Sequence, residues 1–242
     1  MRVLAARPEV TSVALLGHSM GAAGSLVAAA AEPSVGAVVA IAAPAGPVRM
    51  TRQTFRLVNL PIPSPIAWPL AWLTTRVVLH PRGHTVASVS AGRSVQEIGG
   101  PVLLVHGTED AIVPFGDLAI LAAARRAALP DAVTGTLAID GGRHSWLYEL
   151  PVFRAAVARF LATALGGPLT PDAAAAAAEA VSAVRPQVPE RLGSIDEEPG
   201  GFRSILRLVR PGAARPSDDA IDAVATVAVA GDPNASRGVP AR

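Results

Sequence analysis

A Gly-x-Ser-x-Gly pentapeptide at residues 17–21 holds the side chain best suited to nucleophilic chemistry, Ser19. It follows a strand-like apolar run at 13–16 and opens into an Ala-rich, helix-like segment at 22–31. In a sharp turn between strand and helix, the two glycines avoid side-chain clashes and permit unusual backbone dihedral angles. This order predicts that Ser19 is exposed as a nucleophile. It also predicts that the amide N–H of Met20, at the positive end of the helix dipole, can stabilise an oxyanion.

Two later stretches also bring polar residues to the end of an apolar strand. Residues 101–110 read as a buried parallel strand followed by a loop that carries Asp110. Residues 136–146 read as a last strand that runs into a Gly-rich loop with His144. Together with the pentapeptide, these stretches resemble the α/β-hydrolase superfamily, whose catalytic residues follow the chain order serine, acid, histidine. The resemblance implies that Asp110 is the acid and His144 the general base.

These residue types have complementary acid–base properties. A serine hydroxyl is a weak nucleophile until a base accepts its proton, and an imidazole that titrates near neutrality can take that proton and later protonate the leaving group. A buried carboxylate on the other ring nitrogen fixes the tautomer and stabilises the imidazolium. Asp110 is therefore expected to remain ionised throughout the reaction.

Other residues near these motifs are alternatives for the same roles. Glu109 adjoins Asp110 but is expected to point elsewhere on the loop, whereas Asp140, close in sequence to His144, is the stronger alternative for the acid. The other histidines are not expected to be the base. His18 and His106 flank strand ends and are expected to be packing or supporting groups, and His80 and His84 lie in an insert at 44–100.

Composition excludes several classes of function. The net charge is only +2, and arginine supplies all the side-chain cations besides histidine without forming a strongly basic block, so nucleic acid is rejected as a partner. The chain has no cysteine, which excludes disulfides and thiolate metal sites. No metal-ligand cluster or phosphate-binding loop is visible, so no cofactor is expected. No uninterrupted apolar run is long enough for a transmembrane helix, and a cytoplasmic location is the expectation.

The pattern of apolar runs predicts an α/β fold. The resemblance implies that it is a partial α/β-hydrolase fold with a mostly parallel sheet, flanking helices and a lid insert. The core is expected to span 1–168, with the lid insert at 44–100. An Ala/Pro-rich extension, 169–242, is expected to form one helix and then disordered chain. Within it, residues 202–210 form a short basic amphipathic segment that could contact a membrane surface or a partner, dock on the core or be disordered.

The insert concentrates aromatic and apolar residues. Among them, Phe55, Trp68 and Trp72 are predicted to line an acyl or hydrophobic pocket over Ser19. The alternative is that these side chains only cap the core, and the two interpretations are compatible.

The main departure from the superfamily lies before the first strand. Only residues 1–12 precede the strand that leads to Ser19, so the family's first strands and the loop that supplies a second oxyanion donor are missing. We therefore expect an amino-terminally truncated hydrolase whose nucleophile strand is a bare sheet edge, poorly soluble or nearly inactive.

The resemblance implies a serine hydrolase that cleaves a small acyl ester, or a peptide bond, through an acyl-enzyme on Ser19. The strand and lid segments look most similar to the bacterial branch of dipeptidyl aminopeptidase-like and acylaminoacyl peptidase-like hydrolases. Two other hypotheses are an inactive, non-enzymatic remnant and a Ser/His site that only binds its ligand.

Overall fold

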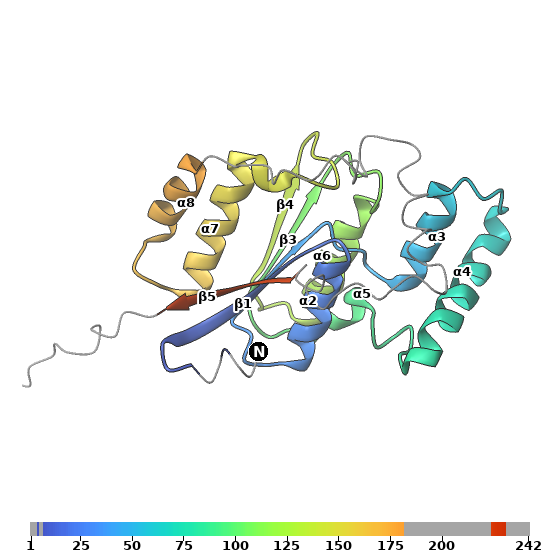
Figure 1. Cartoon of the computed structure of the whole chain (residues 1–242), viewed down its shortest axis with the longest axis horizontal. Helices are drawn as coiled ribbons and strands as arrows, with labels where there is room; N and C mark the ends of the chain where they lie inside the picture. Colours follow the sequence, from blue (N-terminus) through green and yellow to red (C-terminus); the bar gives the residue numbers. More distant parts are fainter. Residues whose placement is uncertain (1–3, 5–6, 182–223, 231–242) are drawn as a thin grey trace, which may run out of the picture.

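The computed structural model describes residues 4, 7–181 and 224–230 of the 242-residue chain. Within these residues lies a five-stranded sheet with the order β4-β3-β2-β1-β5 (Figure 1). Strands β1 to β4 pair in parallel, and β5 runs antiparallel to β1. The predicted, mostly parallel sheet is therefore confirmed. The strands span Val10–His18 (β1), Ala37–Ile41 (β2), Val102–Gly107 (β3), Thr134–Ile139 (β4) and Val224–Ala230 (β5).

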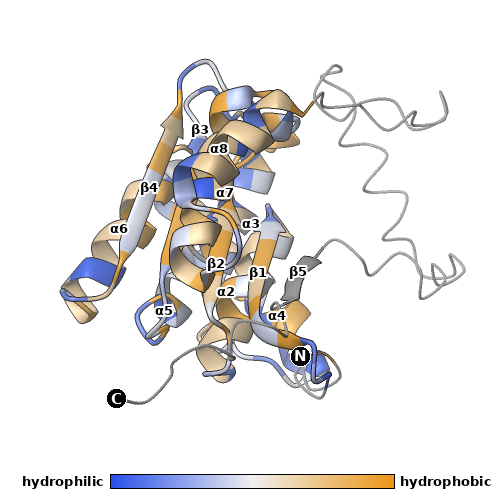
Figure 2. Cartoon of the chain, turned by 90° about the vertical axis from the view of Figure 1, so that its left-hand side faces the viewer, coloured by the Kyte–Doolittle hydropathy of each residue, from blue (hydrophilic) through white to orange (hydrophobic). Residues whose placement is uncertain are grey.

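Helices cover both faces of the sheet, as predicted. Val38 and Leu104 pack in one cluster with residues of α2, α5 and α6, whereas the neighbouring Val39 and Leu103 pack in a second cluster with residues of α7. Successive side chains of a strand point to opposite faces, so the continuous apolar runs of β2 and β3 fill both clusters. These strands lie between the helix layers in Figure 2. The helices span Met20–Ala31 (α2), Pro47–Leu57 (α3), Ser64–Leu79 (α4), Ala91–Ser94 (α5), Gly116–Ala128 (α6), Pro151–Leu165 (α7) and Pro171–Ala180 (α8).

Strand β1 is paired on both sides, so the expectation of a bare edge at the nucleophile strand is wrong. Its partner β5 lies in the part of the chain for which the sequence predicted disorder, and the pairing runs from Val10 opposite Ala230 to Gly17 opposite Val224. The segment 224–230 is rich in β-branched residues, which favour a pleated strand. Pairing with β5 satisfies backbone groups of β1 that an open edge would leave unpaired.

The predicted extension begins with a helix, α8, that packs against α7. Thr170 caps α8, since its side chain accepts a hydrogen bond from the amide of Ala173. Arg154 of α7 donates to the carbonyl oxygen of Ala178 near the end of α8. The basic amphipathic segment 202–210 lies outside the described residues.

The insert forms a helical hairpin, α3 and α4, that projects at one end of the molecule beyond α5 and α6 (Figure 1). A short 3₁₀ turn, His80–Arg82, follows it, and α5 then returns the chain to the core. Asp117, at the start of α6, is buried and anchors the first helix of the insert. Its carboxylate accepts hydrogen bonds from the Ala45 amide at 2.8 Å and from Arg49 at 3.0 and 2.6 Å.

No helix in the described part of the chain combines the length and the apolar character that crossing a bilayer requires.

The Asp117 anchor predicts a loss of stability when it is removed. Asp117→Ala leaves a buried amide and a guanidinium without their acceptor, which costs about 1–3 kcal/mol. Asp172→Ala is the matched control, because it also removes an Asp–Arg pair, with Arg159, but an exposed one that contributes less than about 1 kcal/mol. Urea unfolding of both variants measures the difference, and equal losses would contradict the anchoring role.

Candidate active site

Ser19 occupies a strained turn between β1 and α2. Its backbone dihedrals are φ 55° and ψ −121°, a region that residues other than glycine rarely adopt. Hydrogen bonds hold the turn in this conformation: the Ser19 amide donates to the carbonyl oxygen of Ile41 in β2 at 2.8 Å, and the Ser19 carbonyl oxygen accepts from the Ala22 and Ala23 amides. The serine is therefore fixed to two neighbouring strands and to the helix that it opens.

The two chain segments at this turn approach each other closely. A Cβ atom at Gly17 would overlap the carbonyl oxygen of Gly21 and would lie 2.5 Å from Ser25 Oγ. The Ser25 hydroxyl donates to that same Gly21 carbonyl oxygen at 2.9 Å. Position 17 thus requires glycine because of space, as the pentapeptide indicated.

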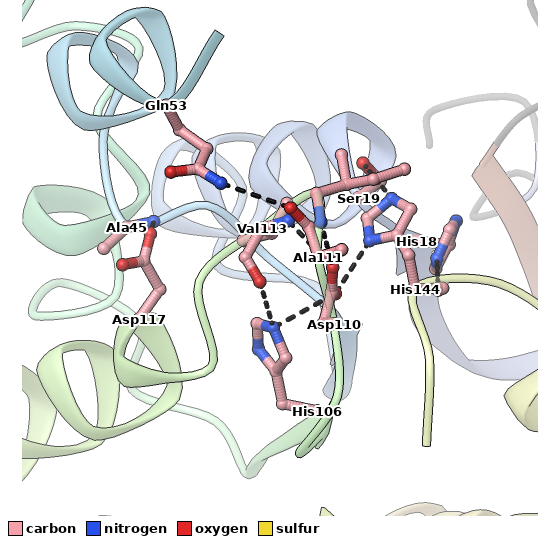
Figure 3. Close-up of polar contacts among 11 residues, drawn as sticks. His18, Ser19, Ala45, Gln53, His106, Asp110, Ala111, Val113, Asp117 and His144 are labelled. Carbon is pink, nitrogen blue, oxygen red and sulfur yellow. Dashed lines mark hydrogen bonds and ion pairs between the residues drawn. The ribbon is translucent and has the colours of Figure 1, made fainter. Parts of the chain in front are cut away.

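The structure brings Ser19, His144 and Asp110 together (Figure 3). The Nε2 atom of His144 lies 3.0 Å from Ser19 Oγ, and its Nδ1 atom lies 2.8 Å from Asp110 Oδ2. Both His144 and Asp110 are buried. Because a carboxylate only accepts, Nδ1 carries the proton of a neutral His144, which leaves the Nε2 lone pair directed at the serine hydroxyl.

Asp110 is held by its own loop as well as by His144. Its Oδ1 atom accepts hydrogen bonds from the amides of Ile112 at 2.9 Å and Val113 at 2.8 Å. Burial alone raises the pKa of the Asp110 carboxyl. Hydrogen bonds from His106, His144 and the Val113 amide, together with the nearby imidazole charge, oppose that effect and hold this pKa well below its usual range.

His106 contacts the same oxygen of Asp110 as His144 does. Its Nε2 atom lies 3.2 Å from Asp110 Oδ2 and 3.1 Å from the carbonyl oxygen of Val113. Since both partners are acceptors, Nε2 carries a hydrogen, and the imidazole packs edge-on against the ring of Phe115. The sequence predicted only a packing or supporting role for His106. The four-residue spacing to Asp110 was the available signal for this contact.

The alternative carboxylates do not reach the imidazole in the described part of the chain. Asp140 is exposed and accepts a hydrogen bond from Thr108 Oγ1 at 3.3 Å. Glu109 is exposed on the loop that carries Asp110. Both lie near the site in sequence, but the Nδ1 atom of His144 is directed at Asp110.

The remaining histidines have other positions. The ring of His18 lies 4.7 Å from that of His144, and its Nε2 atom is 2.6 Å from the His144 carbonyl oxygen. This contact, which the sequence did not predict, holds the backbone of the loop that presents the imidazole. His80 and His84 are exposed on the insert.

Met20 is the first residue of α2, where the helix offers its amide no acceptor, and the amide therefore remains available as a donor. Its side chain is exposed.

An apolar cavity of about 410 Å³ lies beside the His144 loop. Phe55, Trp68 and Trp72, the residues predicted to bind substrate, are not among those that line it. Trp68 and Trp72 lie half-exposed on α4 instead. The cavity is lined by Leu16, His18, Ile41, Ser145, Trp146, Leu147, Tyr148 and Phe153.

No group of His, Asp and Glu side chains among the described residues is arranged to hold a metal ion.

Comparisons with known proteins identify the fold. No protein-family model matches the sequence, and no curated protein matches it. Among solved structures, Est1E from Butyrivibrio proteoclasticus is similar with a TM-score of 0.50 and 21% identity, over 68% of this chain and 66% of that one. The chain has a partial α/β-hydrolase fold.

Two other similar structures are an esterase and a peptidase. An esterase from Pyrococcus furiosus matches with a TM-score of 0.43 and 17% identity, over 62% of this chain and 53% of its own. An acylaminoacyl peptidase from Pyrococcus horikoshii matches with a TM-score of 0.39 and 15% identity, over 54% of this chain and 19% of its own. The chain thus spans about half the length of the first of these two proteins and a fifth of the second.

The close approach of the chain at Gly17 predicts that adding a methyl group there lowers the stability of the fold. Gly17→Ala must displace the Gly21 backbone and should destabilise the fold by about 1–3 kcal/mol, as overpacking does. Gly24→Ala, in the helix α2 that follows, with no atom within 4 Å of the new Cβ, should instead stabilise the fold by about 0.4–1 kcal/mol. Urea unfolding measures both, and a neutral Gly17→Ala would contradict this account of the turn.

The lowered pKa of Asp110 predicts a specific sensitivity to acid. The folded protein keeps this carboxyl ionised where the unfolded chain binds a proton, so its ionisation stabilises the fold above about pH 4. That stabilisation is lost progressively as the pH falls below this value. Between about pH 5 and pH 3 the free energy of unfolding should therefore fall more steeply in the wild type than in Asp110→Asn. Parallel pH profiles in urea unfolding would refute the prediction.

Proposed function

We propose that this chain is a serine hydrolase that cleaves a carboxylic ester through an acyl-enzyme on Ser19. The observation that carries the proposal is the continuous hydrogen-bond chain from Asp110 through His144 to the hydroxyl of Ser19. A nucleophile within hydrogen-bond reach of a base that is itself oriented by a third group is the arrangement that acyl transfer requires.

The first half-reaction forms the acyl-enzyme. His144 Nε2 accepts the proton of Ser19 as Oγ attacks the ester carbonyl carbon, and the tetrahedral intermediate carries its charge on the former carbonyl oxygen. The Met20 amide, at the start of α2, is the proposed donor to this oxyanion. The imidazolium, stabilised by Asp110, then protonates the leaving alcohol, and the ester C–O bond breaks.

The second half-reaction releases the acid. Water attacks the acyl carbonyl while His144 takes one of its protons, and collapse of the second intermediate returns that proton to Ser19. The ionised Asp110 favours each imidazolium state, because its pKa lies well below the pH of the reaction. No step requires a metal or an organic cofactor.

An apolar acyl group suits the surroundings of the site. The cavity beside the His144 loop is lined chiefly by aliphatic and aromatic side chains, and it is large enough for a short acyl chain or a small ring. We therefore take small acyl esters as the substrate class.

Ser19→Ala should abolish hydrolysis of a nitrophenyl ester and labelling by a fluorophosphonate probe, because water lacks the positioning of the serine hydroxyl. His144→Ala should behave alike, since the members of a triad act as a unit. Ser34→Ala, which removes an exposed hydroxyl remote from the site, is the control and should label as the wild type does. Labelling that persists in Ser19→Ala would overturn the assignment, and a folded wild type that never labels would support an inactive remnant or a binding site.

The acid is tested by a matched pair of substitutions. Asp110→Asn should lower kcat about 10³–10⁴-fold, because the amide no longer fixes the reactive tautomer of His144. Asp140→Asn should cost far less, since that carboxylate bonds Thr108 instead. Steady-state kinetics decides between them, and an equal or larger loss at Asp140 would transfer the acid role.

A further inference from the structure

Helix α4 presents an aliphatic stripe to solvent. Ile66, Leu70, Leu73 and Val77 are spaced by four, three and four residues, which places them on one face of the helix, and all four are exposed, Val77 by 62%. The opposite face, formed by Ala67, Ala71 and Thr75, is buried. A helix with apolar residues on its outward as well as its inward side is normally covered on both.

Two tryptophans lie on the far side of α4 from this stripe, each two positions after a stripe residue, and an arginine lies near each ring. The Cζ atom of Arg52 lies 5.8 Å from the ring centroid of Trp68, and that of Arg76 lies 5.2 Å from the centroid of Trp72. Both indoles are half-exposed. An arginine stacked on an exposed indole keeps its charge in water while its stem covers apolar surface.

The charge of the hairpin is positive and largely unbalanced. Residues 47–79, which form the hairpin, contain four arginines and no acidic residue, whereas the rest of the chain contains 17 arginines and all 19 acids. Of the four, only Arg49 has a carboxylate within 4 Å among the described residues. The hairpin also lies at the end of the molecule away from α7 and α8 (Figure 1), so no other element of the described residues separates it from a planar surface on that side.

We propose that the outer face of α4, together with the arginines of the hairpin, docks on a bilayer surface that contains anionic phospholipid. The helix would lie in the plane of the interface with its aliphatic stripe among the acyl chains and its arginines on lipid phosphates. A second copy of the chain fits less well, because two hairpins face to face would bring their arginines together with no acid on either to pair them. This binding goes beyond the proposed hydrolysis and does not depend on Ser19.

Flotation of the full chain with lipid vesicles tests the proposal. The protein should float with vesicles of phosphatidylcholine that contain phosphatidylglycerol, should not float with phosphatidylcholine alone, and should be released as the salt concentration rises. Absence of flotation with the anionic vesicles would overturn the proposal.

Matched variants locate the binding face. The triple change Arg52→Gln, Arg56→Gln and Arg76→Gln should weaken vesicle binding about 100-fold, at about five-fold for each arginine. The control triple at positions 7, 126 and 159, Arg to Gln, changes the net charge equally at exposed sites outside the hairpin and should retain most of the binding. Equal losses in the two triples would overturn the assignment to α4.

A second matched pair tests the aliphatic stripe. Leu73→Asp should weaken vesicle binding more than about tenfold, since it removes apolar area that the bilayer would bury and adds a negative charge. Val152→Asp, at an equally exposed apolar position on α7, should not. Vesicle binding that survives Leu73→Asp would overturn the proposal. So would a dimer, seen by light scattering, that Leu73→Asp dissociates without loss of vesicle binding.

The same experiment separates this inference from the proposed hydrolysis. Ser19→Ala should float as the wild type does. A chain that labels with the fluorophosphonate probe but does not float is a hydrolase without this surface, and a chain that floats but does not label has the surface without the proposed chemistry.

Discussion

The carboxylate of Asp110 is the group on which the arrangement of the site depends. It is buried and carries a charge, so it persists only because four donors surround it: two amides of its own loop and one nitrogen from each of two imidazoles. One imidazole comes from β3 and the other from the loop after β4, which makes the pairing of these two strands a requirement of the site. At Gly107 the end of β3 approaches this loop so closely that a Cβ atom would overlap the Gly142 carbonyl oxygen.

A second constraint acts on the serine. The positive φ of Ser19 is unfavourable for any residue with a side chain, and the neighbouring elements hold it there through the Ile41 carbonyl oxygen and the first turn of α2. Ala42, the residue after β2, also has a positive φ of 49° and is fully buried. Two of the four non-glycine residues with positive φ in the described part of the chain therefore lie where β1 and β2 end side by side, at the edge of the sheet that carries the hydroxyl.

The sequence predicted the features that local chemistry dictates and missed those that long-range contacts create. The turn around Ser19, the parallel strands and the Thr170 cap follow from residue types within a few positions of one another. The pairing of β5 with β1 joins segments about 200 residues apart, and the bonds of Asp117 to Ala45 and Arg49 cross about 70 residues. Neither of these long-range contacts leaves a pattern in the local sequence. The prediction that Phe55, Trp68 and Trp72 line a pocket rested on composition, which does not show which way a helix faces.

The two helices of the insert have different relations to the rest of the molecule. Helix α3 is tied to the site, since Gln53 donates to the carbonyl oxygen of Ala111, next to Asp110, and Arg49 pairs with the buried Asp117. Helix α4 meets α3 where the Thr75 hydroxyl lies 2.7 Å from that of Thr51, and the buried face of α4 otherwise carries small residues, Ala67 and Ala71, which bury little apolar area. Its large side chains are left on the outside, so the apolar surface that a lid would turn toward the serine lies here on the outward face of the hairpin.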